Sequence, residues 1–204
     1  NISGMCIKDK EDNCVIAINS MMTVGRQRFS LAHEFYHYFF DDNMMSVCSR
    51  EIEVGEENEK KADIFASYLL MPRTALYEKV EILKNNKNDR LNLKDIIKIE
   101  QYFKVSHLTS LYQLYNCHFI NKSEFEEYKN IHVRRISELM GYDSDLYKPS
   151  NDNKRYYTYG KYLKLAKQAL DKELISDGKY EELLLEAFRP DLVYGLEEEG
   201  DVID

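Results

Sequence analysis

The sequence has no tryptophan, only three prolines, and four cysteines among its 204 residues. The cysteines form no Cys-x-x-Cys pair, which predicts free thiols in a reducing compartment and excludes a disulfide-stapled secreted scaffold. No apolar run is long enough to cross a bilayer, and the N-terminus lacks the charged-then-apolar pattern of a signal peptide. We therefore expect a cytoplasmic protein with no membrane partner.

The sequence also has no excess of positive charge. Lysine and arginine number 28 against 36 aspartates and glutamates, which gives a net charge of −8. This balance argues against nonspecific binding to nucleic acid, whose phosphates attract basic surfaces. The hydrophobic content of 44% is ordinary for a globular protein, and the length allows one domain or two small ones.

The segment 29–40 is almost wholly apolar and contains the pattern His33-Glu34-x-x-His37. On an α-helix, positions i and i+4 lie on one face, so the two imidazoles can bind a single ion. Glu34 projects about 100° round from His33, where it can take a proton from a water on that ion. This is the chemistry of a zinc peptidase, with Glu34 as the catalytic base.

The alternative is an accidental pattern with two histidines on an ordinary amphipathic helix. The apolar surroundings disfavour it, because unliganded histidines are costly to bury there. A third candidate ligand also lies downstream, as a catalytic zinc site requires.

That third ligand is expected on a helix that ends near Pro72. Its core stripe is formed by Ala62, Phe65, Ala66, Leu69 and Leu70, and Glu59 continues this stripe toward the N-terminus. Asp63 lies four residues after Glu59 and could accept the outer N–H of a ligating histidine. Glu56, one turn earlier, is the main rival of Glu59, although an acidic run of this kind is usually a solvated surface.

The two blocks together resemble the ImmA/IrrE family of metallopeptidases. The first block is Arg28-Phe-Ser-Leu-Ala-His33-Glu34-x-x-His37, and the second is Glu59-x-x-Ala62-Asp63-x-Phe-Ala66 followed by Leu69-Leu-Met-Pro72. The resemblance covers residues 14–72 most clearly. One departure is Tyr36, which stands where the family commonly has glycine before the second histidine.

The resemblance implies that His33, His37 and Glu59 bind Zn²⁺ and that Glu34 is the general base. It also implies an intracellular peptidase whose protein substrate is a transcriptional repressor of the helix-turn-helix class. Cleavage of that repressor would relieve repression.

Fold and domains follow from the same patterns. We predict an α+β fold, with a zincin-like metallopeptidase core and a small antiparallel sheet at residues 1–80, and a mainly helical region at 81–204. Residues 1–20 read as a hairpin whose edge, at Ile16, Ala17 and Ile18, could pair with an extended substrate. Cys6 and Cys14 could face one another across its turn, and Cys48 is placed in a loop between the metal helices.

Residues 91–116 resemble a helix-turn-helix unit, with two helices joined at 104–106, and another helix is predicted from Ser123 to Met140. Direct DNA binding by this unit is disfavoured, because the second helix carries no lysine or arginine for phosphates or guanine. A structural or substrate-docking role is favoured. The group that stabilises the oxyanion is not identified, and the candidates are His107, His118, His132 and the tyrosines.

The sequence thus predicts a zinc metallopeptidase acting on an intracellular protein. Two alternatives are a noncatalytic regulator with a vestigial metal site and a zinc hydrolase of nonpeptide substrates. The intact set His33, Glu34, His37 and Glu59 argues against the first. The shape of the cavity would decide the second, because a long groove suits a peptide.

Overall fold

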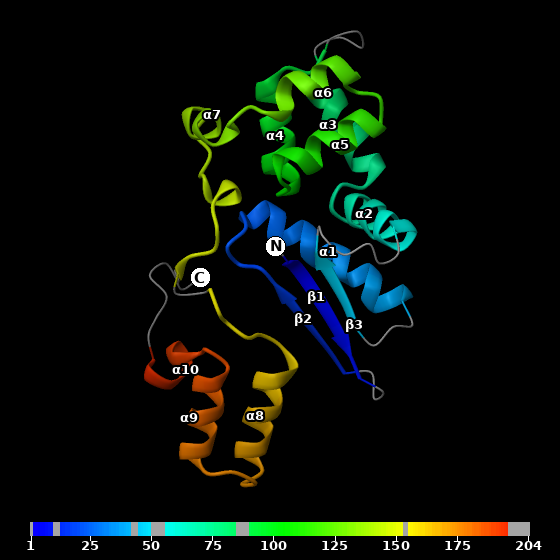
Figure 1. The fold of residues 1–204 in the computed structure, drawn as a ribbon. Helices are drawn as coiled ribbons and strands as arrows, with labels where there is room; N and C mark the ends of the chain where they lie inside the picture. Colours follow the sequence, from blue (N-terminus) through cyan, green and yellow to red (C-terminus); the bar gives the residue numbers. More distant parts are fainter. Residues whose placement is uncertain are drawn as a thin grey trace. The chain divides into compact units, whose positions relative to one another are not determined.

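A computed structural model of the chain describes residues 2–9, 13–41, 45–49, 56–84, 90–152 and 155–195. It has the predicted α+β fold, in which a small sheet and one long helix precede a series of shorter helices (Figure 1). The chain forms two compact units, Asn1–Ser150 and Asn151–Asp204, which are described separately. The domain boundary predicted at residue 80 falls inside the first unit, and the division of that unit into domains stays a prediction.

The sheet has three antiparallel strands in the order β2-β1-β3. The predicted hairpin is confirmed by β1 (Ile2–Lys8) and β2 (Cys14–Ile18), in which Met5 pairs with Ala17. The sulfur atoms of Cys6 and Cys14 lie 3.4 Å apart as free thiols. The third strand, β3 (Met45–Ser49), was not predicted, so the assignment of Cys48 to a loop was wrong.

The long helix α1 (Val24–Phe40) packs against the sheet and carries both motif histidines. Gly4 of β1 makes this close packing possible, because a Cβ at that position would lie 2.7 Å from Oε1 of Glu34. At the other end, Lys8 donates hydrogen bonds to the carbonyls of His37 (2.9 Å), Tyr38 (3.1 Å) and Asp41. A cation at a helix C-terminus satisfies free carbonyls and the helix dipole, so Lys8 fixes the end of α1 to the sheet.

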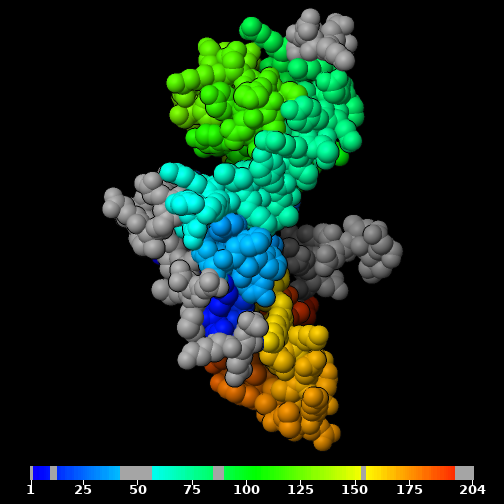
Figure 2. Space-filling view, turned by 90° about the vertical axis from the view of Figure 1, so that its right-hand side faces the viewer, coloured from blue at the N-terminus to red at the C-terminus, as the bar shows by residue number. Residues whose placement is uncertain are grey.

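The second metal helix, α2 (Glu56–Leu70), packs against α1. Ala62 and Ala66 are fully buried, as the predicted stripe requires, and their small side chains allow the two helices to approach closely. Leu69 was expected in the same stripe but is 49% exposed. Figure 2 shows α2 in cyan against α1 in blue, with the chain continuing from α2 toward the green helices.

Five helices follow α2 in the first unit: α3 (Arg73–Leu83), α4 (Leu93–Phe103), α5 (His107–Asn116), α6 (Lys122–Lys129) and α7 (Val133–Leu139). The predicted pair at 91–116 is present as α4 and α5. Lys104 adopts a left-handed conformation after α4, and the hydroxyl of Ser106 caps α5. The single helix predicted from Ser123 to Met140 was wrong, because α6 and α7 are separate.

A hydrophobic core holds these helices together. Its buried members come from α3, α4, α5, α6 and their connections: Met71, Leu76, Val80, Leu91, Ile96, Ile99, Phe103, Val105, Leu111, Leu114, Cys117, Ile120 and Phe125. This core is continuous with α2 through Met71, which follows α2 directly. The packing of the helical half therefore also holds the C-terminal end of α2.

The start of α1 is tied to the helical half by two contacts. The chain after the 3-10 helix η1 (Asp145–Tyr147) returns to α1, where the N–H of Val24 donates to the carbonyl of Lys148 at 2.8 Å. Gly25 lies against the beginning of α5, so that an added Cβ would stand 2.8 Å from the backbone nitrogen of Ser106. The two metal helices and α5 are consequently held in one packed arrangement.

The second unit contains α8 (Lys161–Asp171), α9 (Asp177–Glu186) and α10 (Pro190–Tyr194). Arg189 organises it: its guanidinium pairs with Asp191 at 2.7 Å and lies over the rings of Tyr157 and Tyr159. Across the parts of the chain that the structure describes, the helices are too short or too polar to cross a membrane.

The contact at Gly25 predicts that alanine destabilises the fold at this position but not at a glycine that has free space around it. Gly25→Ala should lower the free energy of unfolding by about 1–3 kcal/mol, because the backbone of Ser106 cannot move away cheaply. Gly178→Ala is the matched control: it is also the second residue of a helix, and a Cβ there meets nothing within 4 Å. We expect the control to be neutral or to stabilise by up to about 1 kcal/mol in urea unfolding. Equal effects of the two substitutions would contradict this account of α1 and α5.

Candidate metal centre

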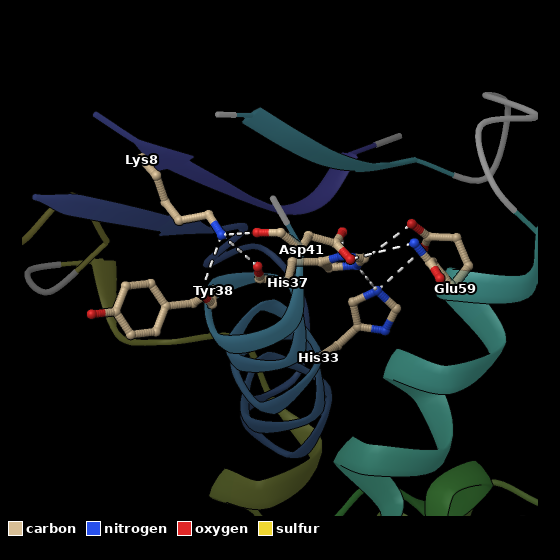
Figure 3. A network of polar contacts seen from close by, with 7 residues as sticks. Lys8, His33, His37, Tyr38, Asp41 and Glu59 are labelled. Atoms are coloured by element: carbon tan, nitrogen blue, oxygen red, sulfur yellow. Dashed lines mark hydrogen bonds and ion pairs between the residues drawn. The ribbon is translucent and has the colours of Figure 1, made fainter. Parts of the chain in front are cut away.

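The side chains of His33, His37 and Glu59 converge between α1 and α2 (Figure 3). The Nε2 atoms of the two histidines lie 3.1 Å apart. Glu59 faces both, with its oxygens 3.2 Å from Nε2 of His33 and 3.5 Å from Nε2 of His37. Both histidines are buried, whereas the Glu59 side chain is 39% exposed. The structure thus brings together the three side chains that the sequence indicated as ligands.

The outer nitrogens of both imidazoles face carboxylates. Nδ1 of His33 lies 2.9 Å from Oδ1 of Asp63, and Nδ1 of His37 lies 2.6 Å from Oδ2 of Asp41. A carboxylate accepts a hydrogen bond, so each Nδ1 carries a proton, and in the neutral imidazole each Nε2 then carries a lone pair. Carboxylates commonly orient metal-ligating histidines in this way. Asp63 therefore lies where the sequence placed it.

This tautomer leaves three acceptors facing one another: the Nε2 atoms of His33 and His37 and the carboxylate of Glu59. Such a group repels itself unless a cation or a proton lies between its members. Tetrahedral zinc with bonds of 2.0–2.2 Å would hold its ligand atoms about 3.3 Å apart. The measured separations of 3.1, 3.2 and 3.5 Å fit that requirement. The donor set consequently suits a small divalent metal ion.

The local charge favours a cation as well. Burial lowers the pKa of His33, but the hydrogen bond and charge of Asp63, with the charges of Glu59 and Glu34, raise the pKa above its ordinary value of 6.5. The carboxylates thus stabilise positive charge at the imidazole. Two neutral imidazoles and a carboxylate are typical zinc ligands.

Glu34 is fully buried beside this cluster, at the point where α1 approaches Gly4. It lies within the wall of a cavity of about 890 Å³ that also contains His33, Glu59 and Asp63. Glu34 belongs to the same helix as both histidines but points to a different side of it. Its carboxylate is therefore close to the donor set without belonging to it.

The cavity extends from the metal centre to α5. Its wall at that end includes Ser106, Leu108, Thr109, Tyr112 and Asn116, and thus runs from the cap of α5 to its last residue. Helices α1 and α2 contribute other parts of the wall, with Phe29, Ile64 and Tyr68 among the lining residues. The space in front of the donor set is therefore bounded by two metal helices and one helix of the helix-turn-helix-like unit.

Other predicted site residues lie elsewhere. Ile16, Ala17 and Ile18 are on the edge strand β2 and do not line the described wall of the cavity, to which the sheet contributes Ser3. Their role in substrate binding stays a prediction. The side chain of the rival ligand Glu56 lies outside the described residues. His118 and His132 are not in this cavity wall.

His107 lines the cavity, but its two ring nitrogens are already engaged. Nδ1 lies 2.6 Å from Oε1 of the fully buried Glu100, and Nε2 lies 2.9 Å from the carbonyl of Tyr128. Tyr147 donates its hydroxyl to the other oxygen of Glu100 at 2.8 Å. Both acceptors require an N–H on His107, so an imidazolium bridges α4, α5 and the end of α6. Because both ring nitrogens are already hydrogen-bonded, His107 is disfavoured as the donor to an oxyanion.

Asp41 is one of two residues near the site that the sequence analysis did not identify. It follows His37 by four positions, and its side chain is only 10% exposed. The same i+4 spacing identified Asp63 from Glu59, so the signal was present in the sequence. Lys8 was also missed, because its contact with the end of α1 depends on how the sheet packs.

The donor set, the adjacent buried glutamate and the α+β core define a metallopeptidase-type domain. The family of IrrE N-terminal-like domains, which are peptidases, matches residues 1–115, more than half of the chain. The chain belongs to this family, and the resemblance seen in the two sequence blocks is confirmed. No curated protein matches the chain.

Asp41 and Asp63, which bind the Nδ1 atoms of the two histidines, should differ in their effect on metal affinity. Asp41→Ala should weaken zinc binding by about 10–100-fold, because it removes a buried partner of His37. Asp63→Ala should weaken it less, because the Asp63 side chain is 61% exposed and water can replace it. Competition with a chromogenic zinc chelator measures both. Glu57→Ala, a change at a side chain that is 84% exposed, is the control. The reverse order of the two aspartates would show that the assigned partners are wrong.

The imidazolium at His107 predicts a pH-dependent stability. Burial lowers the pKa of His107, but the hydrogen bond and charge of Glu100 and the carbonyl of Tyr128 raise it above 6.5. A raised pKa stabilises the fold fully below pH 6.5, and this contribution disappears as the pH rises through the folded-state value. His107→Gln should therefore cost about 1–3 kcal/mol of unfolding free energy at pH 6 and less at pH 9.

The exposed residue His132 provides the control, since His132→Gln should leave the pH profile unchanged. Urea unfolding at both pH values measures the effect. A cost of His107→Gln that stays constant or grows with pH would show that the bridging imidazole is neutral.

Proposed function

We propose that the chain is a zinc-dependent endopeptidase that cleaves an intracellular protein. The observation that carries this proposal is the set of three acceptors on His33, His37 and Glu59, together with Glu34, which lines one cavity with His33 and Glu59. Membership of the IrrE N-terminal-like peptidase family supports the same activity.

The proposed mechanism assigns one role to each side chain. His33, His37 and Glu59 would hold a zinc ion, which would supply Lewis acidity and lower the pKa of a bound water. Asp41 and Asp63 hold the imidazoles in the tautomer that presents Nε2. Glu34 takes the proton from the attacking water and delivers it to the nitrogen of the departing amine. The burial of Glu34 against Gly4 fixes its carboxylate on the cavity side of α1.

A peptide is favoured over a small molecule by the length of the cavity. The wall runs along all of α5, and a helix of 10 residues is about 15 Å long. An extended peptide advances about 3.3 Å per residue, so four or five residues could lie along this wall. A zinc hydrolase of small substrates would not need a cavity of this length.

The proposed substrate is a transcriptional repressor of the helix-turn-helix class, whose cleavage relieves repression. The resemblance to the ImmA/IrrE family supports this substrate, and the net charge of −8 disfavours direct action on DNA. Zinc as the metal is supported by the ligand types and by their separations.

Glu34→Gln tests the mechanism, because the amide fills the same space but cannot accept the proton. We expect unchanged zinc content by elemental analysis and a loss of cleavage of about 10²–10⁴-fold with candidate repressors. Glu57→Gln, at an exposed site on α2, should retain both metal and activity. Wild-type activity in Glu34→Gln would remove this residue from the mechanism, and loss of zinc would assign it to the metal site instead.

A further inference from the structure

We propose that α5, the second helix of the helix-turn-helix-like unit, selects the substrate by binding a bulky apolar side chain of the extended peptide. Leu108 and Tyr112 form the binding surface. This inference rests on the proposed function, because it assigns a specificity role within the same cavity.

The two faces of α5 have different surroundings. Leu111 and Leu114 are fully buried in the core of the helical half. Leu108 and Tyr112 lie one turn apart on another face, and they are 43% and 52% exposed although they line the cavity. The pair therefore lies outside the buried core, at its edge. Apolar side chains that line a cavity and contact solvent gain stability when a ligand covers them.

Several polar groups on the same wall hold α5 in place. The hydroxyl of Ser106 caps the helix and lies 2.8 Å from the hydroxyl of Thr109. Gln113 donates to the carbonyl of Met71 at 3.3 Å, which ties α5 to the end of α2. Tyr112 is supported by the ring of Phe125, at 4.9 Å between centroids. The apolar pair is consequently presented on a fixed surface.

Helices α1 and α2 supply further apolar side chains to the same cavity. Ile64 of α2 lines the same cavity and is 55% exposed, and Phe29 of α1 lines it as well. Ile64 lines the cavity together with Glu59 and Asp63 of the metal cluster. An extended peptide held at the metal can therefore place a neighbouring side chain between α2 and α5. Leucine or phenylalanine fits such a site better than glycine or a charged residue.

This placement also explains why α5 lacks basic residues. In a DNA-binding helix-turn-helix, the second helix enters the major groove and needs donors to phosphates and bases. Here the side chains of α5 line a cavity that contains the metal centre. The unit resembles a DNA reader in its helix order, but its second helix serves the peptidase site.

Peptidyl hydroxamates test the inference without turnover, because the hydroxamate binds zinc directly. Two series are needed, in which a glycine, leucine or phenylalanine residue precedes or follows the hydroxamate. We expect one series to bind zinc-loaded wild type at least about tenfold more tightly with phenylalanine or leucine than with glycine. Leu108→Ser and Tyr112→Ala should reduce this ratio to about twofold or less with unchanged zinc content, and any fall in the melting temperature of Tyr112→Ala should be matched by Tyr115→Ala, which loses a similar contact with Phe125.

Tyr115→Ala is the matched control. Tyr115 is on the same helix, is 40% exposed and also packs against Phe125, but it lines a different cavity. It should leave the ratio at the wild-type value. An unchanged ratio in the Leu108 and Tyr112 variants, or an equal loss in Tyr115→Ala, would overturn the role of α5.

Two further outcomes separate this inference from the proposed function. If the zinc-loaded chain binds no hydroxamate, glycine included, the metal centre itself fails, and the inference fails with it. If the glycine compound binds and the leucine and phenylalanine compounds bind with the same affinity, the metal centre is supported but α5 does not select the substrate. Binding of duplex DNA that Tyr112→Ala abolishes would assign α5 to DNA and overturn the inference.

Discussion

Three hydrogen-bond acceptors lie close together in the first unit, and the rest of that unit is arranged to hold them there. The Nε2 atoms of His33 and His37 and the carboxylate of Glu59 lie 3.1–3.5 Å apart, although none of them carries a proton in the tautomer set by Asp41 and Asp63. Such an arrangement is stable only with positive charge at its centre. The surrounding carboxylates provide that preference before any substrate is present.

The rest of the first unit keeps these acceptors in position. Lys8 fixes the C-terminal end of α1 to the sheet, while Gly25 fixes its N-terminal end against α5. The small residues Ala62 and Ala66 let α2 lie close enough for Glu59 to reach the histidines. Replacement of any of these contacts by a larger or uncharged group would move one helix relative to the other. A displacement of about 1 Å is enough to spoil a site of this kind.

Features set by local periodicity could be predicted from the sequence, and features set by long-range packing could not. The spacing of His33 and His37 and the stripe of Ala62 and Ala66 are helical regularities, and both appear in the structure. The strand β3 pairs with β1 across more than 35 residues, and its sequence, Met-Ser-Val-Cys-Ser, gives a weak strand signal.

The same distinction applies within the site. Asp63 was found from its i+4 relation to Glu59, and Asp41 could have been found from its relation to His37. Neither the capping of α1 by Lys8 nor the engagement of both nitrogens of His107 has a local signature. His107 illustrates the difficulty best. It was one of several candidate oxyanion donors until its two partners, Glu100 and the carbonyl of Tyr128, were known.

The carboxylates at the metal cluster favour substrate selection by apolar contact beside the metal, although the wall of the same cavity also contains Arg26 and Arg73. The carboxylates that line it, Glu34, Glu59 and Asp63, all belong to the metal cluster, where they stabilise a cation or move a proton. An acidic substrate side chain would be repelled there, and a basic one would compete with the metal for the same carboxylates. Selection by an apolar side chain at α5 avoids both conflicts, because it adds affinity without changing the charge around zinc. The metal centre and the helix-turn-helix-like unit can therefore share one cavity, in which the first performs the hydrolysis and the second binds a substrate side chain.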